Sequence, residues 1–447
     1  MNNPSVTSKL SRRRFLATTG AAVLLPTVLP GCALGRGSKP AASNRITLGV
    51  VGWGMQGPGN TRQFLALDDC QVVAACDLDK NHLNNAVETI NSHYGNKDCK
   101  AYSDYRELLS RGDIDAVMLA VPDHWHALVA VEAAGRKKDI YGEKPLARTI
   151  AEQQAIVKAV QANGRIWQTG SWQRSVANFH KAAEIVRNGL IGTVTHVNVG
   201  LPQGHTDFAK TRDRMTPTAP PPELDYETWI GPSKMEPYIC GRVHMNWRWN
   251  YNIGGGQLLD WVGHHCDIAH WALDLDRSGP LEIEGHGDFP PADAVWNTCT
   301  KYRVELKYPG NLTMTIAGGW PDIKMGTKWI GTEGWVYVNR GEFQGSNPDW
   351  SEYKELPEEM RRIKLYRSRN HQRNFLDCVK SRQPTITPVE TAHHSTIPGH
   401  LGLISMLTGR KLNWDSSKEV IVEDAEASKL LTRSYRLPWK FESIAQL

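Results

Sequence analysis

Short apolar runs alternate with amphipathic stretches over the first third of the chain. The segments RITLGVV (45–51), QVVAACDLD (71–79) and IDAVMLAV (114–121) are rich in β-branched and apolar residues, as is typical of strands buried in a sheet. HWHALVAVEAAG (124–135) has apolar residues at helical spacing, and DIYGEKP (139–145) predicts another strand with its exit loop. Strands that alternate with helices in this way predict an α/β domain with a doubly wound parallel sheet.

The alternation stops at about Gln173, where a second pattern begins. VTHVNVGLPQ (194–203), KYRVELKY (301–308), LTMTIAGGW (312–320) and WVYVNR (335–340) predict strands separated by long loops. This pattern indicates an α+β domain with a mainly antiparallel sheet.

One long loop, from Gly204 to Tyr251, is rich in Pro, Trp and Asp and has little periodicity. Loops of this length in compact domains usually form lids or binding walls, so we expect this one to border a ligand site.

The N-terminal residues 1–32 predict a targeting segment rather than part of the fold. Lys9 and three arginines at 12–14 precede an apolar stretch that Gly and Pro interrupt and that is too short to span a bilayer. SRRRFL (11–16) resembles a twin-arginine export signal, and LPGC (29–32) resembles a lipoprotein cleavage box with Cys32 as the lipidated residue. The sequence therefore predicts export to the periplasm, as a soluble protein or as a lipoprotein anchored at Cys32. An ordinary basic amphipathic start is the alternative.

The same patterns divide the chain. After the leader, residues 33–44 form a small polar linker, residues 45–170 the first domain and residues 171–447 the second.

Net charge and cysteine spacing limit the kinds of binding partner and metal site that the sequence predicts. The leader holds four cations, so the net charge of +5 falls to +1 without it, and nucleic acid is not an expected partner. The cysteines other than Cys32 show no CxxC spacing and predict neither a zinc ribbon nor a disulfide framework.

The first predicted strand ends in GWGMQG (52–57), a glycine-rich turn that precedes a helix. In this context Gly52 permits the tight turn, Gly54 lets a pyrophosphate approach the backbone, and Gly57 lets helix and strand pack closely. The helix N-terminus then faces the phosphates. The turn therefore predicts a dinucleotide site of the Rossmann type; a plain turn that binds nothing is the alternative.

Asp77, at the end of the second predicted strand, is placed to accept hydrogen bonds from an adenosine ribose. Its charge would repel a 2′-phosphate, so NAD is favoured over NADP. The expected cofactor contacts in this region are Gly52, Gly54, Met55, Gln56, Gly57 and Asp77.

Ligands of parallel sheets bind beyond the carboxyl ends of the strands. The residues that follow the next two predicted strands are Pro122, Asp123, His126, Glu143 and Lys144. Of these we expect Pro122, His126, Glu143 and Lys144 beside the cofactor. Lys144 precedes a proline, which favours an extended conformation and aims its ammonium toward the nicotinamide.

Three glycines, 254–256, end the long loop before a predicted helix. Asp260 and His264 are four residues apart and therefore share one face of this helix. A carboxylate beside an imidazole suits acid/base chemistry. The alternatives are a buried structural pair or a metal site that adds His265, Asp267 and His270, but these side chains cannot all face one way, and we expect no metal.

These motifs, in this order, resemble the Gfo/Idh/MocA family of sugar and cyclitol oxidoreductases. The resemblance covers nearly all of residues 45–410 and rests on GWGMQG, on EKP at 143–145 and on GGxxxDxxxH at 255–264. It implies a Rossmann domain followed by an α+β domain with an open sheet, often used for oligomer contacts. A homo-oligomer formed through the C-terminal sheet is therefore expected.

The resemblance also implies roles for three residues. Lys144 corresponds to the family's catalytic lysine, Asp260 to its substrate-positioning aspartate and His264 to its general base. His264 then takes the proton of a sugar hydroxyl, Lys144 stabilises the alkoxide and NAD accepts the hydride. Weaker candidates for substrate contact are Arg174, His244, Arg248 and Tyr251.

The expected function is that of an exported, NAD-dependent oxidoreductase acting on a sugar or glycoside hydroxyl. Because the periplasm has no nicotinamide pool, the cofactor should stay tightly bound and be recycled in place. One alternative is an NAD-dependent glycoside hydrolase that oxidises, eliminates, hydrates and reduces; its second acid/base would be Tyr141, His244 or Tyr251. Another is a non-catalytic, NAD-bound sugar-binding protein.

Overall fold

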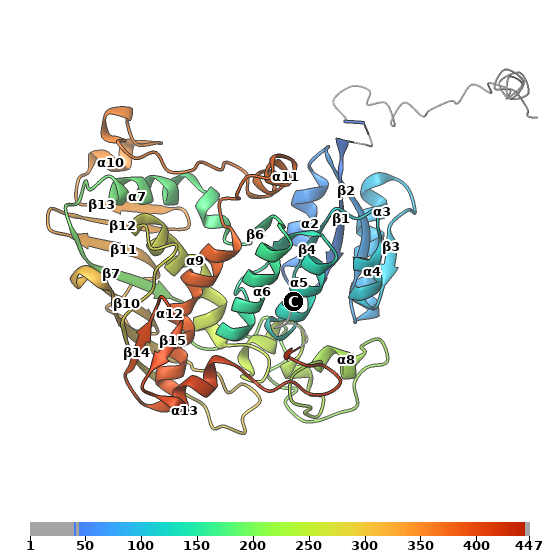
Figure 1. Ribbon diagram of the computed structural model, residues 1–447. Helices are drawn as coiled ribbons and strands as arrows, with labels where there is room; N and C mark the ends of the chain where they lie inside the picture. The colour runs from blue at the N-terminus through green and yellow to red at the C-terminus, as the bar shows by residue number, and fades with distance from the viewer. Residues whose placement is uncertain (1–39, 42–43, 443–447) are drawn as a thin grey trace, which may run out of the picture. The chain divides into compact units, whose positions relative to one another are not determined.

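The computed structural model describes residues 40–41 and 44–442 (Figure 1), so the predicted leader, Cys32 and most of the linker lie outside the described residues. Every helix and strand described below belongs to the compact unit that begins at Ile46. Among the described residues, no helix combines the length and apolar character that crossing a lipid bilayer requires.

The first domain is built on a six-stranded sheet in the order β3-β2-β1-β4-β5-β6. All of its strand pairs are parallel, which confirms the predicted doubly wound sheet. The strands are β1 (Ile46–Val51), β2 (Cys70–Cys76), β3 (Lys100–Tyr102), β4 (Ala116–Leu119), β5 (Asp139–Gly142) and β6 (Trp167–Thr169).

Helices cover both faces of this sheet. They are α2 (Gly57–Leu65), α3 (Lys80–Tyr94), α4 (Tyr105–Ser110), α5 (His126–Gly135) and α6 (Ile150–Ala162), with a 3₁₀ turn η2 (Asp123–Trp125) before α5. Successive residues of β1 enter different cores, because side chains alternate along a strand. Val50 packs in the core that contains Phe64 of α2, and Val51 in the core that contains Leu128 of α5.

The second domain is built on a nine-stranded sheet in the order β13-β12-β11-β7-β10-β9-β8-β14-β15. β7 and β10 run parallel and the other pairs are antiparallel, so the sheet is mixed but mainly antiparallel. The strands are β7 (Val194–Leu201), β8 (Glu282–Asp288), β9 (Lys301–Lys307), β10 (Thr313–Gly318), β11 (Gly326–Gly331), β12 (Trp335–Asn339), β13 (Glu342–Gly345), β14 (Leu412–Asp415) and β15 (Val420–Val422).

Three long helices pack on this sheet: α7 (Ala177–Arg187), α9 (Gly256–Leu273) and α12 (Val389–Thr408). The core between them includes Leu258 and Cys266 of α9 with Val199 of β7 and Trp329 of β11. The remaining helices are α8 (Tyr226–Ile230), α10 (Asp349–Glu352), α11 (His371–Ser381) and α13 (Ala425–Ser428). Short 3₁₀ turns are η3 (Trp172–Ser175), η4 (Cys240–Arg242), η5 (His244–Trp249), η6 (Pro309–Asn311), η7 (Glu358–Met360) and η8 (Lys429–Leu431).

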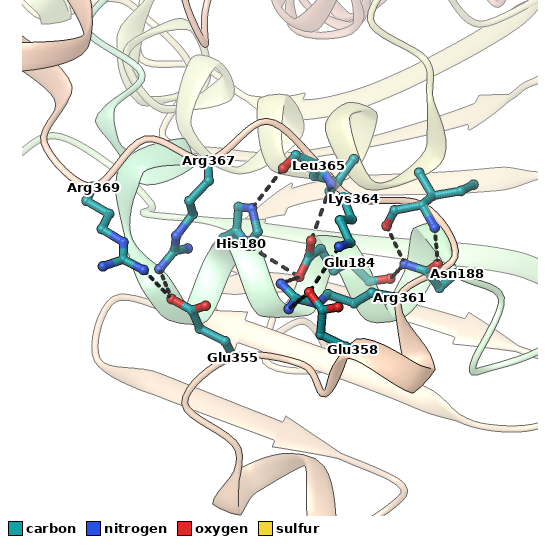
Figure 2. Close-up of polar contacts among 11 residues, drawn as sticks. His180, Glu184, Asn188, Glu355, Glu358, Arg361, Lys364, Leu365, Arg367 and Arg369 are labelled. Carbon is teal, nitrogen blue, oxygen red and sulfur yellow. Dashed lines mark hydrogen bonds and ion pairs between the residues drawn. The ribbon is translucent and has the colours of Figure 1, made fainter.

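Figure 2 shows how the segment between α10 and α11 is fastened to α7. The side chain of Glu184 accepts a hydrogen bond from the amide of Leu365 at 3.3 Å, and Asn188 accepts one from the amide of Ile363 at 2.7 Å. Glu355 and Glu358 add ion pairs within the segment to Arg361, Lys364, Arg367 and Arg369. These bonds fix an otherwise irregular stretch on the second domain.

The chain then returns to the first domain. The ring of Phe375 in α11 lies 6.0 Å from that of Phe64 in α2. Further on, Arg433 donates a hydrogen bond of 2.7 Å to the buried carboxylate of Glu152 in α6. The chain thus passes between the two domains more than once, and residues of both domains form the crevice between them.

Candidate functional site

A cavity of about 730 Å³ lies beyond the carboxyl ends of β1, β2 and β4. This is the point where the strand order of the first sheet reverses, and doubly wound folds bind their ligands there. The second domain supplies the other wall through η5, α9 and the turn after β12. The loop from Gly204 to Tyr251 contributes Phe208, Trp229, His244, Trp247 and Arg248, as expected of a binding wall.

The glycine turn after β1 has the geometry that its motif predicts. Gly52 has φ +94°, and a Cβ there would lie 2.4 Å from the carbonyl oxygen of Ala120. A Cβ on Gly57 would lie 2.2 Å from the carbonyl oxygen of Gly52, so the glycine permits close helix–strand packing. Nothing lies within 4 Å of the position that a Cβ on Gly54 would take, which leaves the backbone open to a ligand.

The N-terminus of α2 is free to bind an anion. Its N-cap residue Gln56 makes no side-chain capping bond, so the amides of Gly57 and Gly59 keep their hydrogen-bonding capacity, whereas Pro58 between them has no N–H to donate. Met55 and Gln56 line the cavity together with Gly52 and Gly54. The turn therefore fits a dinucleotide pyrophosphate.

Asp77 stands at the end of β2 and lines the same cavity. Its Oδ2 accepts a hydrogen bond of 2.6 Å from the amide of Trp53, and its Oδ1 one of 2.9 Å from the amide of Asp79. Burial raises the pKa of Asp77, while the nearby His82 opposes the rise. Each carboxylate oxygen has a second lone pair for a ligand hydroxyl, which suits the predicted ribose contact.

Aromatic side chains that the sequence analysis did not predict close this end of the cavity. Trp125 lies edge-on to Tyr105 at 5.9 Å and to Trp439 at 5.8 Å, and all three line the cavity. Trp439 belongs to the segment after η8, which carries no recognisable motif. An aromatic wall of this kind suits a flat base.

Between the two domains, Lys144 of the first domain contacts Asp260 of the second, although 116 residues separate them. Lys144 Nζ lies 3.1 Å from Asp260 Oδ1, and Arg248 Nε lies 3.1 Å from the same oxygen. Burial alone would raise the pKa of Asp260, but the charges of Lys144 and Arg248 outweigh it and hold the pKa below its ordinary value. Asp260 is therefore an ionised carboxylate shared by two cations.

His264 lies one turn further along α9 and lines the cavity with Asp260. Its Nδ1 is buried without a hydrogen-bond partner among the described residues, and its ring lies 5.4 Å from that of Trp261. Burial, and then the charges of Lys144 and Arg340, hold the pKa of His264 well below its ordinary value. The imidazole is neutral at pH 7 and able to accept a proton.

Asp123 is a buried carboxyl in the same cavity to which the sequence analysis gave no role. Asp123 is 3% exposed, and its Oδ1 has no hydrogen-bond partner among the described residues. Burial, and then the charge of Asp260, raise the pKa of Asp123 to about 7. Its position directly after a strand of a parallel sheet could have indicated a role in ligand binding or catalysis.

Arg340 was missed altogether. It lies in the turn between β12 and β13, and its guanidinium carbon lies 4.7 Å from the ring centres of both Trp172 and Trp261. All three residues line the cavity. A single arginine after a strand gives no signal in the sequence, because only the tertiary fold brings this hairpin to the cavity.

Pro122 and Glu143 line the cavity as expected, and Glu143 accepts a 2.8 Å hydrogen bond from Asn60 of α2. Gly57 and His126 do not line it. His126 is instead a positioning residue. Its ring nitrogens lie 2.9 Å and 2.8 Å from the carbonyl oxygens of Val121 and Pro145, which ties together the two loops that carry Pro122 and Lys144.

The structure corrects two of the four candidate substrate contacts. Arg174 is 1% exposed and pairs with the carboxylates of Asp267 and Asp276, so it is occupied in the domain core. Tyr251 does not line the cavity, and its ring packs against the guanidinium of Arg148 at 4.3 Å. Arg248 does reach the site, through Asp260.

Tyr141, another candidate for the second acid/base, is buried in β5 and does not line the cavity, and Gln372 donates a 3.3 Å hydrogen bond to its hydroxyl. His244 lines the cavity but lies beside Asp79 and His82, near Asp77. One ligand atom from each of Asp79, His82 and His244 lies within 4.8 Å of the others, so this group could hold a metal ion.

Comparison with known proteins places this geometry in a wider context. The family description "Oxidoreductase family, NAD-binding Rossmann fold" matches residues 46–171, and "Oxidoreductase family, C-terminal alpha/beta domain" matches residues 175–441. Similar curated proteins include a Glycosyl hydrolase family 109 protein of Shewanella pealeana, 30% identical over 42% of this chain and 45% of that protein. Inositol 2-dehydrogenase of Salmonella typhimurium is 31% identical over 52% of this chain and 55% of that protein. The chain thus spans about half the length of these relatives.

Solved structures share the fold over a greater length at lower identity. The WlbA dehydrogenase from Chromobacterium violaceum, in complex with NADH and UDP-GlcNAcA, gives a TM-score of 0.63 at 16% identity over 84% of this chain and 98% of that one. An aldose-aldose oxidoreductase from Caulobacter crescentus, complexed with glycerol, gives 0.60 at 16% identity over 83% and 99%.

Proposed function

The chain belongs to the Gfo/Idh/MocA oxidoreductase family, and from this premise we propose that it oxidises a hydroxyl group of a sugar or glycoside with NAD as hydride acceptor. The observation that carries the proposal is the meeting of Lys144, Asp260 and His264 in one cavity with the glycine turn. A protein that only bound a sugar would have no need of a neutral imidazole and an ammonium at the same place. The names of the relatives, inositol dehydrogenase and sugar oxidoreductases, support the substrate class.

The residues of the site divide the work as follows. When bound, NAD supplies a hydride acceptor at its nicotinamide ring. Neutral His264 takes the proton of the substrate hydroxyl, and Lys144 stabilises the negative charge that develops on its oxygen. Asp260 fixes the ammonium of Lys144 through their 3.1 Å contact and accepts a hydrogen bond from the substrate.

We further propose that the cofactor stays bound through many turnovers and that the protein is exported. The twin-arginine-like leader motivates the export proposal, and the periplasm offers no nicotinamide to exchange. The walls formed by Trp125 and Trp439 support retention, as does the anchoring of the C-terminal segment by Arg433 on Glu152. A retained cofactor must be restored in place, for example by oxidising one sugar and reducing a second carbonyl compound.

Redox-neutral glycoside hydrolysis is the second candidate, and Asp123 favours it. In that reaction the sugar is oxidised to a ketone, the acidified neighbouring C–H loses its proton, the glycosidic bond breaks, water adds and the sugar is reduced. The step at the C–H needs a second acid/base, and Asp123 is a buried carboxyl whose pKa of about 7 suits proton transfer. A glycosyl hydrolase family 109 protein among the relatives supports the same alternative.

One experiment separates the two candidates. The purified protein, with no added NAD, is incubated with aryl glycosides in heavy water. Oxidation alone gives a keto-sugar and a reduced cofactor that absorbs at about 340 nm, whereas hydrolysis releases the phenol and leaves deuterium on the sugar carbon next to the oxidised one. Absence of both products with a full panel of sugars and glycosides contradicts the proposed chemistry.

Subunit assembly is a separate proposal. We retain the expectation of a homo-oligomer formed through the sheet of the second domain, which light scattering of the purified protein tests.

A further inference from the structure

Arg340 is held at the cavity by its neighbours, but none of the described residues forms an ion pair with it. Its guanidinium lies over the rings of Trp172 and Trp261. Gln173 accepts hydrogen bonds of 3.2 Å from Nη2 and 3.4 Å from Nε, which fixes one edge of the group. Within residues 44–442, no carboxylate lies within ion-pair distance of Arg340, and no hydrogen bond of its Nη1 is found. One edge of a rigidly held cation is therefore available to a ligand.

Lys144 and Arg248 also line the cavity, and they share the carboxylate of Asp260. Arg340 lies close enough to feel Asp260 and to lower the pKa of His264. Six further carboxyls line the cavity: Asp77, Asp79, Asp104, Asp123, Glu143 and Asp225. None of them lies within ion-pair distance of Arg340, and Glu143 accepts a hydrogen bond from Asn60. Arg340 therefore lacks the direct carboxylate contact that Lys144 and Arg248 share, and a ligand anion can supply it.

The shape of the group narrows the class of anion. A planar guanidinium presents parallel N–H groups that match a carboxylate, and stacking on aromatic rings preserves that plane. Trp172, one of the two tryptophans that hold Arg340, lines the cavity, and its indole can provide a flat apolar surface for a sugar ring. A carboxylate carried on a sugar ring meets both requirements in one ligand.

We propose that Arg340 binds a carboxylate group of the substrate, so that the cavity takes acidic sugars of the uronic acid class in preference to their neutral parents. That this ligand is a substrate rests on the proposed sugar oxidation, but the preference in binding affinity can be measured by itself. The orientation follows from the positions of the residues: the carboxylate lies at Arg340, and the hydroxyl to be oxidised lies between Lys144 and His264.

The test measures binding by calorimetry on the purified protein with its cofactor. The probes are glucuronate, galacturonate and mannuronate, each compared with its parent hexose. We expect at least one acid to bind about 10- to 100-fold more tightly than its parent, the range that a charge-assisted hydrogen-bonded pair contributes. Arg340→Gln should remove that advantage by weakening the binding of the acid much more than that of the parent hexose, while Arg340→Lys should restore only part of it.

Arg303→Gln serves as the matched control. Arg303 also lies near an indole ring, 5.5 Å from that of Trp320, but does not line the cavity. This variant should bind acids and hexoses as the unmodified protein does. The proposal is overturned if every acid binds no more tightly than its parent, if Arg340→Gln weakens acid and parent equally, or if glucose 6-phosphate binds more tightly than all three acids.

Hydride transfer is followed separately, by the absorbance of the reduced cofactor after each sugar is added. If no sugar reduces the cofactor but uronate binding still depends on Arg340, the proposed oxidation fails and the anion site stands. If hexoses are oxidised and no acid binds preferentially, the oxidation stands and the anion site fails.

Discussion

The Cβ of Lys144 packs directly against Gly263 of α9, so closely that a methyl group on Gly263 would lie 3.2 Å from it. Gly263 immediately precedes His264. A glycine inside a helix costs about 1 kcal/mol relative to alanine, so its use here comes at the expense of helix stability. The glycine permits a short distance between the loop after β5, which carries Lys144, and helix α9, which carries Asp260 and His264.

Replacing Gly263 by alanine should therefore separate activity from stability. The added methyl group must displace the Lys144 backbone by a few tenths of an ångström, and misplacement on that scale should lower kcat about tenfold. The melting temperature should hold or rise, because alanine favours the helix. Gly135→Ala in α5, where a Cβ would meet nothing within 4 Å, is the control. An unchanged kcat in Gly263→Ala would show that this contact does not set the geometry.

Lys144→Met should remove stabilisation of the developing alkoxide while the cavity stays intact. We expect turnover to fall about 10²- to 10⁴-fold, with the bound nucleotide retained, as measured by steady-state kinetics and by the nucleotide content of the protein. Lys354→Met, at an exposed lysine that does not line the cavity, should have no effect. Unchanged turnover in Lys144→Met would show that Lys144 does not stabilise the alkoxide.

Asp260→Asn should destabilise the protein, since it leaves Lys144 and Arg248 without their shared carboxylate. The three side chains are only 11–13% exposed, and breaking a pair at that burial costs about 3–5 kcal/mol in the free energy of unfolding. Chemical denaturation measures the loss. Adding Arg248→Met to Asp260→Asn should recover part of it, because one unpaired cation is then removed. Additive losses in the double variant would contradict the pairing.

Asp123 should make stability depend on pH. Its pKa is about 7 in the folded protein against an ordinary value of 3.8, so between about pH 4 and pH 7 the folded state holds a proton that the unfolded state has lost. Raising the pH through that window therefore destabilises the unmodified protein, by up to about 4 kcal/mol, but not Asp123→Asn. The difference in unfolding free energy between the two should grow from pH 4 to pH 7 and level off above it.

Asp113→Asn controls for the loss of any carboxylate. The hydrogen bond from Arg111 holds the pKa of Asp113 below its ordinary value, so its effect on stability changes only below about pH 4. A flat difference between Asp123→Asn and the unmodified protein across pH 4–7 would mean that Asp123 stays ionised.

The protein should retain its nucleotide through purification. Acid release followed by mass spectrometry should give NAD rather than NADP, because the carboxylate of Asp77 repels a 2′-phosphate. Trp439→Ala opens the aromatic wall and should lower the retained fraction on dialysis about tenfold. Trp335→Ala, a tryptophan of β12 that does not line the cavity, should retain as much as the unmodified protein. NADP in the extract, or equal retention in both variants, would contradict this assignment.

Local spacing made part of this site predictable. The roles of Gly52 and Gly57 follow from one turn, and Asp260 and His264 share a face because a helix repeats every 3.6 residues. Arg174 shows where such reasoning ends. Its sequence neighbourhood resembles that of a surface arginine, and only the tertiary fold brings two carboxylates to it. Arg340 illustrates the opposite error, because the sequence did not indicate a site residue in this hairpin turn. Its place at the site depends on contacts with two tryptophans that are distant in sequence.

The wall formed by Pro438, Trp439 and Lys440 is synthesised after the strands of both sheets. A chain still being translated can fold its nucleotide domain, yet that cradle has one side missing, and any dinucleotide that enters is free to leave. We expect capture to become durable only once this wall has docked against Trp125. A pulse of labelled nucleotide should therefore enter chains whose wall has not yet docked far faster than it enters mature ones.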